Sequence, residues 1–201
     1  KTKKFQGRFQ PWLWYPFKSQ ENFEGIQYWP DGQTNMLEGQ FKEGKLHGKG
    51  IEYWKTGKKR YEGEFINGRW EGDGIEYLDD GKTKKSQGRF RMEKLHGEGI
   101  QYWSDGQTKR FEGHFEEGLF HGTGIEYWQT GQKRYEGMFK GGLWEGDGIE
   151  YLDDGKTKKF QGRFQPWLWY PFKSQENFEG IQYWPDGQTN MLEGQFKEGK
   201  L

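Results

Sequence analysis

The 201-residue sequence contains no cysteine, no alanine and no valine. The absence of cysteine excludes disulfide bonds, and it leaves the compartment open because secreted proteins can also lack them. Alanine and valine are among the residues that normally fill a thick, close-packed core. Their absence therefore favours a thin structure over a rounded domain with a buried centre.

The chain also lacks an excess of charge of either sign and has no long hydrophobic run. Its 31 basic residues balance 31 acidic residues, whereas a nucleic-acid-binding surface needs a basic excess or stripe. Zero net charge removes long-range self-repulsion, so that copies associate side by side more easily. No apolar run approaches the roughly 18 residues of a membrane span, and no signal peptide is visible. A secreted filament and a cytoskeletal or cortical scaffold both stay open.

Aromatic residues and glycine dominate what is present. The chain has 11 Trp, 11 Tyr and 16 Phe beside 33 glycines. Its mean hydropathy of −1.25 is very polar, but disordered chains are poor in aromatics and tend to carry an unbalanced charge. The composition therefore indicates a folded sheet in which large rings cover bare backbone.

A long stretch of the sequence occurs twice. Residues Lys1–Leu46 recur without a substitution as Lys156–Leu201, which defines a period of 155 residues. We expect the chain to be a window onto a longer tandem array. Enzymes rarely need a second copy of themselves, whereas fibres, scaffolds and multivalent binders do, so the repeat favours a structural or binding role.

Aligning the glycines reveals a shorter period of 24 or 25 residues, which is typical of stacked repeat architectures. Two units follow the same plan but carry seven extra residues. We predict one continuous array over 1–201 with units 5–36 (long), 37–60, 61–85, 86–110, 111–134, 135–159, 160–191 (long) and 192–201 (partial).

The residue pattern of each unit predicts a strand, a turn, a second strand and a second turn. In the first strand Tyr61, Gly63 and Phe65 fall on one face of an extended segment, and glutamates fall on the other. Asn67-Gly68 predicts a tight hairpin turn, because both residue types tolerate positive φ. Helix is excluded because glycine at nearly every fourth position would cost about 1 kcal/mol each in a helix interior.

In the second strand Ile75 and Tyr77 share a face, opposite Gly74, and we expect this tyrosine to face inward. Asp80-Gly81 then turns the chain into the next unit. The pattern predicts an all-β fold, an elongated, solenoid-like, single-layer antiparallel sheet of stacked β-hairpins.

Glycine inside strands is normally unfavourable, and its regular placement needs a reason. A ring on a neighbouring strand can lie flat over a residue without a side chain and shield the backbone from water, an arrangement known as aromatic rescue. We therefore predict structural roles for Gly63, Gly72, Gly74, Gly113, Gly122, Gly124, Gly137, Gly146 and Gly148.

The repeated pattern resembles a known family, the MORN (membrane occupation and recognition nexus) repeat. The resemblance rests on Phe111-Glu112-Gly113-x-Phe115-x-x-Gly118-x-x-His121-Gly122-x-Gly124-Ile125-x-Tyr127, which recurs in 37–60, 61–85 and 135–159. It implies stacked hairpins used as scaffolds at membranes, in cytoskeletal structures or beside catalytic domains. In this chain the spacer after the tyrosine is longer, and the two long units carry an aromatic insert.

The polar residues do not predict a catalytic, metal or cofactor site. His47, His96 and His121 each precede a glycine at the same turn position, one or more hairpins apart, without the clustered ligands of a metal site. The carboxylate pairs recur in repeat register, whereas acid–base catalysis needs a unique pocket that separates two pKa values. Asp79-Asp80-Gly81 lacks the ligand spacing of a calcium loop. We expect neither an enzyme nor a cofactor.

Two sets of aromatic residues are candidate contacts with a partner. A row of tryptophans follows the tyrosine that ends each second strand, so it points to the opposite face; it either covers glycines there or forms a contact stripe. The insert Pro11–Phe17, repeated as Pro166–Phe172, is either a flap on its own sheet or a knob that docks on a neighbour. The candidates are Trp12, Leu13, Trp14, Tyr15, Phe17, Trp54, Trp103, Trp128, Trp167, Trp169, Tyr170, Phe172 and Trp184.

The favoured function is a filament or scaffold whose partner is itself, joined laterally through these aromatics. The alternative is a MORN-type binding module that recognises a membrane surface or another protein, although small basic patches such as Lys82–Lys85 suit anionic lipid poorly. A glycan binder acting through Trp54 and Trp103, and an appendage of an enzyme domain, are further alternatives.

Overall fold

A computed structural model describes residues 5–9, 23–165 and 178–196. It divides into two compact units, Lys1–Leu95 and His96–Leu201. The described residues contain no helix, so none of them forms a segment able to cross a membrane as an α-helix.

All the regular structure in the described residues is β-strand. The strands are β1 (Phe5–Phe9), β2 (Phe23–Tyr28), β3 (Asn35–Lys42), β4 (Lys45–Tyr53), β5 (Lys59–Ile66), β6 (Arg69–Tyr77), β7 (Lys84–Arg91), β8 (Lys94–Tyr102), β9 (Lys109–Glu116), β10 (Leu119–Tyr127), β11 (Lys133–Lys140), β12 (Leu143–Tyr151), β13 (Lys158–Phe164), β14 (Phe178–Tyr183) and β15 (Asn190–Phe196).

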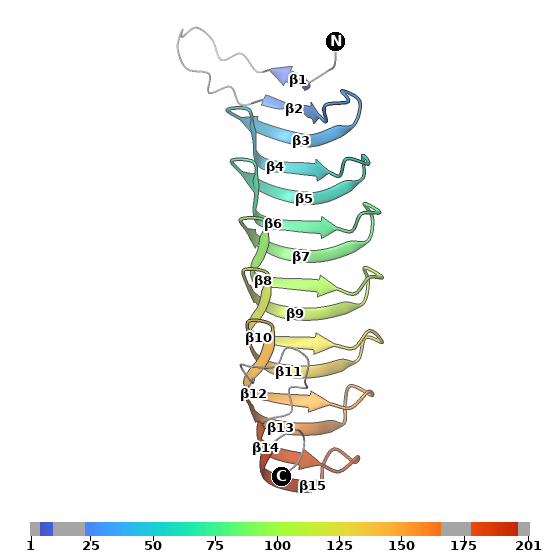
Figure 1. The fold of residues 1–201 in the computed structure, drawn as a ribbon, viewed down its shortest axis with the longest axis vertical. Coiled ribbons are helices and arrows are strands. Elements are labelled where there is room, and N and C mark those ends of the chain that lie inside the picture. The colour runs from blue at the N-terminus through green and yellow to red at the C-terminus, as the bar shows by residue number, and fades with distance from the viewer. Residues whose placement is uncertain (1–4, 10–22, 166–177, 197–201) are drawn as a thin grey trace. The chain divides into compact units, whose positions relative to one another are not determined.

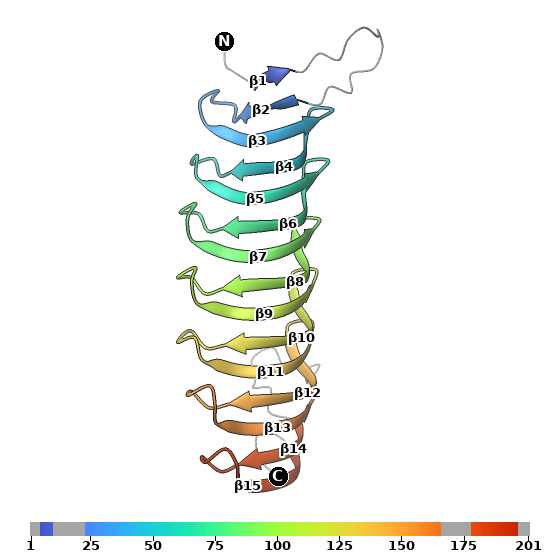
Figure 2. The same cartoon turned by 180° about the vertical axis from the view of Figure 1, so that it is seen from behind.

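The strands form open antiparallel sheet in chain order. In the first unit β1 to β7 pair each with the next, and in the second unit β8 to β15 do the same. Figure 1 shows the hairpins of each unit stacked side by side, and Figure 2 shows them from behind. The predicted fold class, an antiparallel sheet of stacked β-hairpins, is confirmed.

The two strands of a hairpin are joined by two residues in left-handed backbone. Asn67 and Gly68 have φ of 53° and 82°, as a type I′ turn requires. Glu117 and Gly118 adopt 51° and 83°. The predicted turn at Asn67-Gly68 is therefore confirmed, and its geometry recurs where the first position is not asparagine.

The turns between hairpins come in two lengths, which accounts for the two repeat lengths. The Trp54 N–H donates to the Lys58 carbonyl, four residues on, whereas the Leu78 N–H donates to the Thr83 carbonyl, five residues on. In the longer turn Asp80 Oδ1 accepts hydrogen bonds from the Lys82 and Thr83 amides, and the Thr83 hydroxyl donates to Oδ2. The extra residue of a 25-residue unit therefore lies in an aspartate-capped turn.

The buried side chains lie on one face of the sheet, here called the core face. Tyr61 stacks on Trp70 with ring centroids 4.3 Å apart. The edge of Phe65 meets the same tyrosine at 5.3 Å, and Phe90 of the following hairpin meets it at 5.1 Å. All four rings are at most 2% exposed. Each cluster thus combines the rings of one hairpin with one ring from the next hairpin, so side chains are buried by local contacts.

A bulge in the second strand lets Trp70 reach Tyr61. The register passes from Gly63↔Gly74 to Phe65↔Trp70, which leaves three residues of β6 opposite one of β5. In the middle of the three, Gly72 has φ of 67°. Because left-handed backbone there costs glycine little, the strand turns back over its own hairpin at this point.

The expected contact between ring and glycine is present in this geometry. A Cβ at Gly74 would overlap the hydroxyl end of the Tyr61 ring, and a Cβ at Gly63 would lie 2.6 Å from the Gly74 Cα. In the second unit Tyr135 covers Gly148 in the same way. Glycine is therefore required at these paired positions for two reasons: the tyrosine ring covers them, and the two backbones approach each other closely.

The prediction that Tyr77 and Ile75 face inward is wrong. The register pairs Tyr61 with Glu76 and Glu62 with Ile75, and directly paired residues lie on the same face of a sheet. The Tyr77 hydroxyl accordingly donates to Glu62 Oε2, at 3.5 Å, on the opposite or outer face. Alternation of residue types could not reveal this. It divides the side chains of the second strand into two faces, but it does not say which of them is the face that carries the rings of the first strand.

Replacing Gly148 by alanine should destabilise the protein by about 3 kcal/mol, because the methyl group overlaps the Tyr135 ring. Gly141→Ala is the matched control, since Gly141 has φ of 58° but an added methyl group would meet nothing within 4 Å; it should cost about 1 kcal/mol. Chemical denaturation of the two variants measures the difference. A loss at Gly148 no larger than that at Gly141 would show that the Tyr135 ring yields to the methyl group, so that ring contact does not select this glycine.

The aspartate-capped turns predict a loss of stability in acid. The Thr83 hydroxyl and the Lys82 and Thr83 amides lower the pKa of Asp80 to about 2. Because the folded pKa is below the unfolded value, the stabilisation is complete above about pH 4 and is lost as the pH falls towards 2. Carboxyl NMR titration should show this midpoint for Asp80, and Thr83→Val should raise it.

Candidate interaction faces of the hairpin array

A row of tryptophan and arginine side chains lines the margin of the core face. The Arg60 guanidinium lies between two indoles, with its carbon 4.7 Å from the Trp54 ring centre and 5.0 Å from that of Trp70. Glu52 accepts from Arg60 at 2.5 Å and from the Trp70 indole N–H at 2.7 Å. Trp54 therefore lies on the face of Tyr61 and Trp70, not on the opposite one as expected.

The same arrangement recurs along the chain. Arg134 lies 4.6 Å from the Trp128 ring centre and 5.1 Å from that of Trp144, and Glu126 binds both Arg134 and the Trp144 indole. Arg110 lies over Trp103 at 5.4 Å. We refer to these groups as the Trp–Arg margin.

The residues of this margin vary together from unit to unit. Tryptophan is paired with arginine in Trp54/Arg60, Trp103/Arg110 and Trp128/Arg134, and with methionine in Trp29/Met36 and Trp184/Met191. Leucine is paired with lysine in Leu78/Lys85 and Leu152/Lys159. Lys85 and Lys159 bind Glu76 and Glu150 as Arg60 and Arg134 bind Glu52 and Glu126, but only the planar guanidinium stacks on an indole.

The predicted contact tryptophans differ in how much surface they present. Trp54, Trp103 and Trp128 are half-buried, and their indole nitrogens are buried without a hydrogen-bond acceptor in the described residues. Trp184 is 48% exposed. The other candidates, Trp12, Leu13, Trp14, Tyr15, Phe17, Trp167, Trp169, Tyr170 and Phe172, lie outside the described residues.

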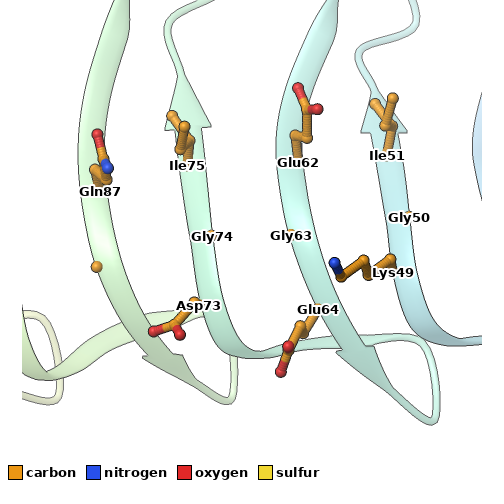
Figure 3. Close-up of a pocket in the computed structure, with 11 residues that line it drawn as sticks. Lys49, Gly50, Ile51, Glu62, Gly63, Glu64, Asp73, Gly74, Ile75 and Gln87 are labelled. Atoms are coloured by element: carbon orange, nitrogen blue, oxygen red, sulfur yellow. The ribbon is translucent and has the colours of Figure 1, made fainter.

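The outer face of the first unit carries an open groove. Figure 3 shows Ile51, Glu62, Ile75 and Gln87 in one row across four strands. A row of glycines separates them from a second row of side chains, formed by Lys49, Glu64 and Asp73. Isoleucine and a polar residue alternate in the first row. The surface is therefore neither wholly apolar nor of one charge.

Glu62, between these isoleucines, is bound by two further polar side chains of the outer face. Glu62 accepts from Lys59 at 2.9 Å and from the Tyr77 hydroxyl at 3.5 Å. Burial first, and then the charge of Glu62, raises the pKa of Tyr77, while the hydrogen bond to Glu62 raises the pKa of Lys59. The tyrosine therefore stays a donor and the lysine stays charged, so this carboxylate is engaged and is poorly placed for acid–base chemistry.

Sequence reasoning missed a set of exposed apolar residues at the hairpin turns. Ile66 is 50% and Met92 is 62% exposed in the first unit, and Leu119 is 53% and Leu143 is 44% exposed in the second. Each lies in, or next to, the two-residue turn of its hairpin. The sequence did indicate them, because an apolar residue lies in or beside the predicted hairpin turn of several repeats.

Two histidines of one hairpin lie close together. The rings of His114 and His121 lie 6.5 Å apart, and His121 Nδ1 is 3.1 Å from Glu116 Oε2. Within the described residues no group of three or more potential ligands is placed to hold a metal ion.

Comparison with known proteins identifies the repeat. The family model described as MORN repeat matches five times, at residues 38–59, 61–83, 87–108, 111–133 and 135–157, and these matches cover more than half of the chain. The chain belongs to the MORN-repeat family. No curated protein matches it.

Membership of the family defines the general role of the array. MORN repeats generally form non-enzymatic modules that interact with proteins or membranes. This chain is a tandem β-hairpin array of MORN repeats, an arrangement that agrees with a structural or binding role. Its particular partner and the absence of catalysis stay predictions.

The pairing of Trp128 with Arg134 predicts energetic coupling. Trp128→Leu and Arg134→Lys should each destabilise the chain, but the double variant reproduces Leu152/Lys159 and should cost about 0.5–1 kcal/mol less than the sum. A double-mutant cycle by thermal unfolding measures the coupling. Trp128→Leu combined with Lys140→Arg is the control and should be additive; additivity in both cycles would contradict the stacking.

Proposed function

We propose that this MORN array is a non-enzymatic structural element that forms a long filament or scaffold by continued stacking of β-hairpins. The observation that carries the proposal is that each aromatic cluster uses one hairpin and one ring from the next, as with Tyr61, Trp70 and Phe90. Nearest-neighbour stabilisation needs no global core, so an array can lengthen without losing stability. The recurrence of Lys1–Leu46 as Lys156–Leu201 supports the same role.

The proposed filament associates laterally through aromatic and apolar side chains. The two Pro-Trp-Leu-Trp inserts supply the densest apolar sequence, and Trp184 adds an exposed indole. The apolar turn residues, of which Met92 and Leu119 are the most exposed, add a second edge for contact. Zero net charge favours close approach of copies.

The alternative proposal is a module that recognises a membrane surface or another protein, which the general role of the family favours. Under this alternative the isolated chain stays monomeric and binds one partner or lipid vesicles. The balance of 31 basic and 31 acidic residues supports a protein partner better than anionic lipid.

Deleting Trp12–Phe17 together with Trp167–Phe172 should abolish lateral bundling while leaving the hairpins folded. Electron microscopy measures bundling, and far-ultraviolet circular dichroism measures the remaining sheet. The control replaces the same twelve residues with serine and glycine, which keeps the length of the segment and removes only its apolar side chains. Unchanged bundles in both variants would refute the role of the insert. A strictly monomeric parent chain that sediments with vesicles would favour the alternative.

A further inference from the structure

One unit of the Trp–Arg margin departs from a rule that the others obey. Where the margin carries a cation, the preceding strand supplies a glutamate two residues before the tryptophan or leucine: Glu52 with Arg60, Glu76 with Lys85, Glu126 with Arg134 and Glu150 with Lys159. All four are ion pairs of 2.5–3.1 Å. Where the margin carries methionine, that position is glutamine: Gln27 with Met36 and Gln182 with Met191.

Arg110 breaks this pattern, because the residue at the glutamate position is Gln101. Its guanidinium is held between two rings, 5.4 Å from the Trp103 centre and 5.7 Å from that of Phe120, and the residue is exposed. The cation is thus positioned as in the other units, but an amide replaces the carboxylate.

The neighbouring core residues account for the glutamine but not for the arginine beside it. Glu52 and Glu126 also accept an indole N–H, from Trp70 and Trp144, whereas Phe120 has none to donate. Glu76 has Leu95 in place of the indole, but its Oε2 accepts a hydrogen bond from the buried Ser86 hydroxyl at 2.9 Å. Gln27 and Gln182 accompany methionine, whereas Gln101 accompanies Arg110, so the cation at this position is what sets the unit apart.

We propose that Arg110, with Gln101 and the Trp103 ring, binds a carboxylate on an acidic side chain of a partner protein. A stacked guanidinium is preorganised for bidentate hydrogen bonds to a carboxylate, and fixing it between rings lowers the entropy lost on binding. The Gln101 amide can donate a further hydrogen bond, which a glutamate could not. The partner thus supplies the carboxylate that Glu52 and Glu126 supply to Arg60 and Arg134 within their own units.

Site chemistry distinguishes this unit from its neighbours. Arg60 and Arg134 are already neutralised within 2.5 and 3.1 Å by their own glutamates, so they offer a partner little charge. A carboxylate would therefore select Arg110 in this part of the array. The inference does not depend on filament formation, since it concerns a single contact in one unit.

The test is an NMR titration of the isotopically labelled 201-residue chain with sodium acetate, against sodium chloride at equal ionic strength. Acetate should shift the Arg110 Nε–H and Trp103 indole signals saturably, with a roughly millimolar dissociation constant, and leave Arg134 as an internal control unmoved. A glutamate-containing tripeptide should act at the same signals. Equal responses of Arg110 and Arg134, or a response to phosphate but not to acetate, would overturn the proposal.

Two variants complete the experiment. Gln101→Glu restores the glutamate found in four other units, so it should fold normally and weaken acetate binding at least about tenfold by occupying Arg110 internally. Arg110→Met copies Met36 and Met191 and should abolish the Trp103 response. Acetate binding of unchanged strength in either variant would show that the carboxylate binds elsewhere. Concentration-dependent loss of the Arg110 signal without added ligand, suppressed by Gln101→Glu, would identify a second copy as the partner.

Discussion

The contact between an aromatic ring and a pair of glycines is the constraint on which the rest of the structure depends. The Tyr61 ring occupies the space that a Gly74 side chain would fill, and Gly63 and Gly74 are too close for either to bear a methyl group. Because ring and glycines come from one hairpin, the contact can be repeated without any long-range partner. Stability then grows by addition of equivalent units.

This local burial separates the two faces of each hairpin. The core face holds the rings, and its margin holds stacked cations such as Arg60 beside Glu52. The outer face holds isoleucines between engaged polar groups such as Glu62, Lys59 and Tyr77. The margin and the turns lie outside the buried ring clusters, so substitutions there can alter the surface while the sheet is kept. Arg110 opposite Gln101 is such a substitution.

Much of the fold follows from short-range pattern, and most of the candidate surfaces do not. Asn67-Gly68 predicts its turn because positive φ is a property of those residues alone. Tyr61 and Phe65 predict one buried face because they alternate. The inward Tyr77 was wrong, and the stacking of Arg60 and the exposed Met92 were missed, because each depends on pairing between strands or on the curl of the hairpin.

The sequence alone determined the strand periodicity, the turns, the repeat lengths and the need for rings over glycines, since all of these are set by residues a few positions apart. Only the tertiary structure decided which face Ile75 and Tyr77 occupy and which residues meet at the core margin. The reason is physical: alternation within a strand leaves two choices of face, and the choice is made by register. The register pairs Gly63 with Gly74, because only two glycines can approach so closely beneath the Tyr61 ring.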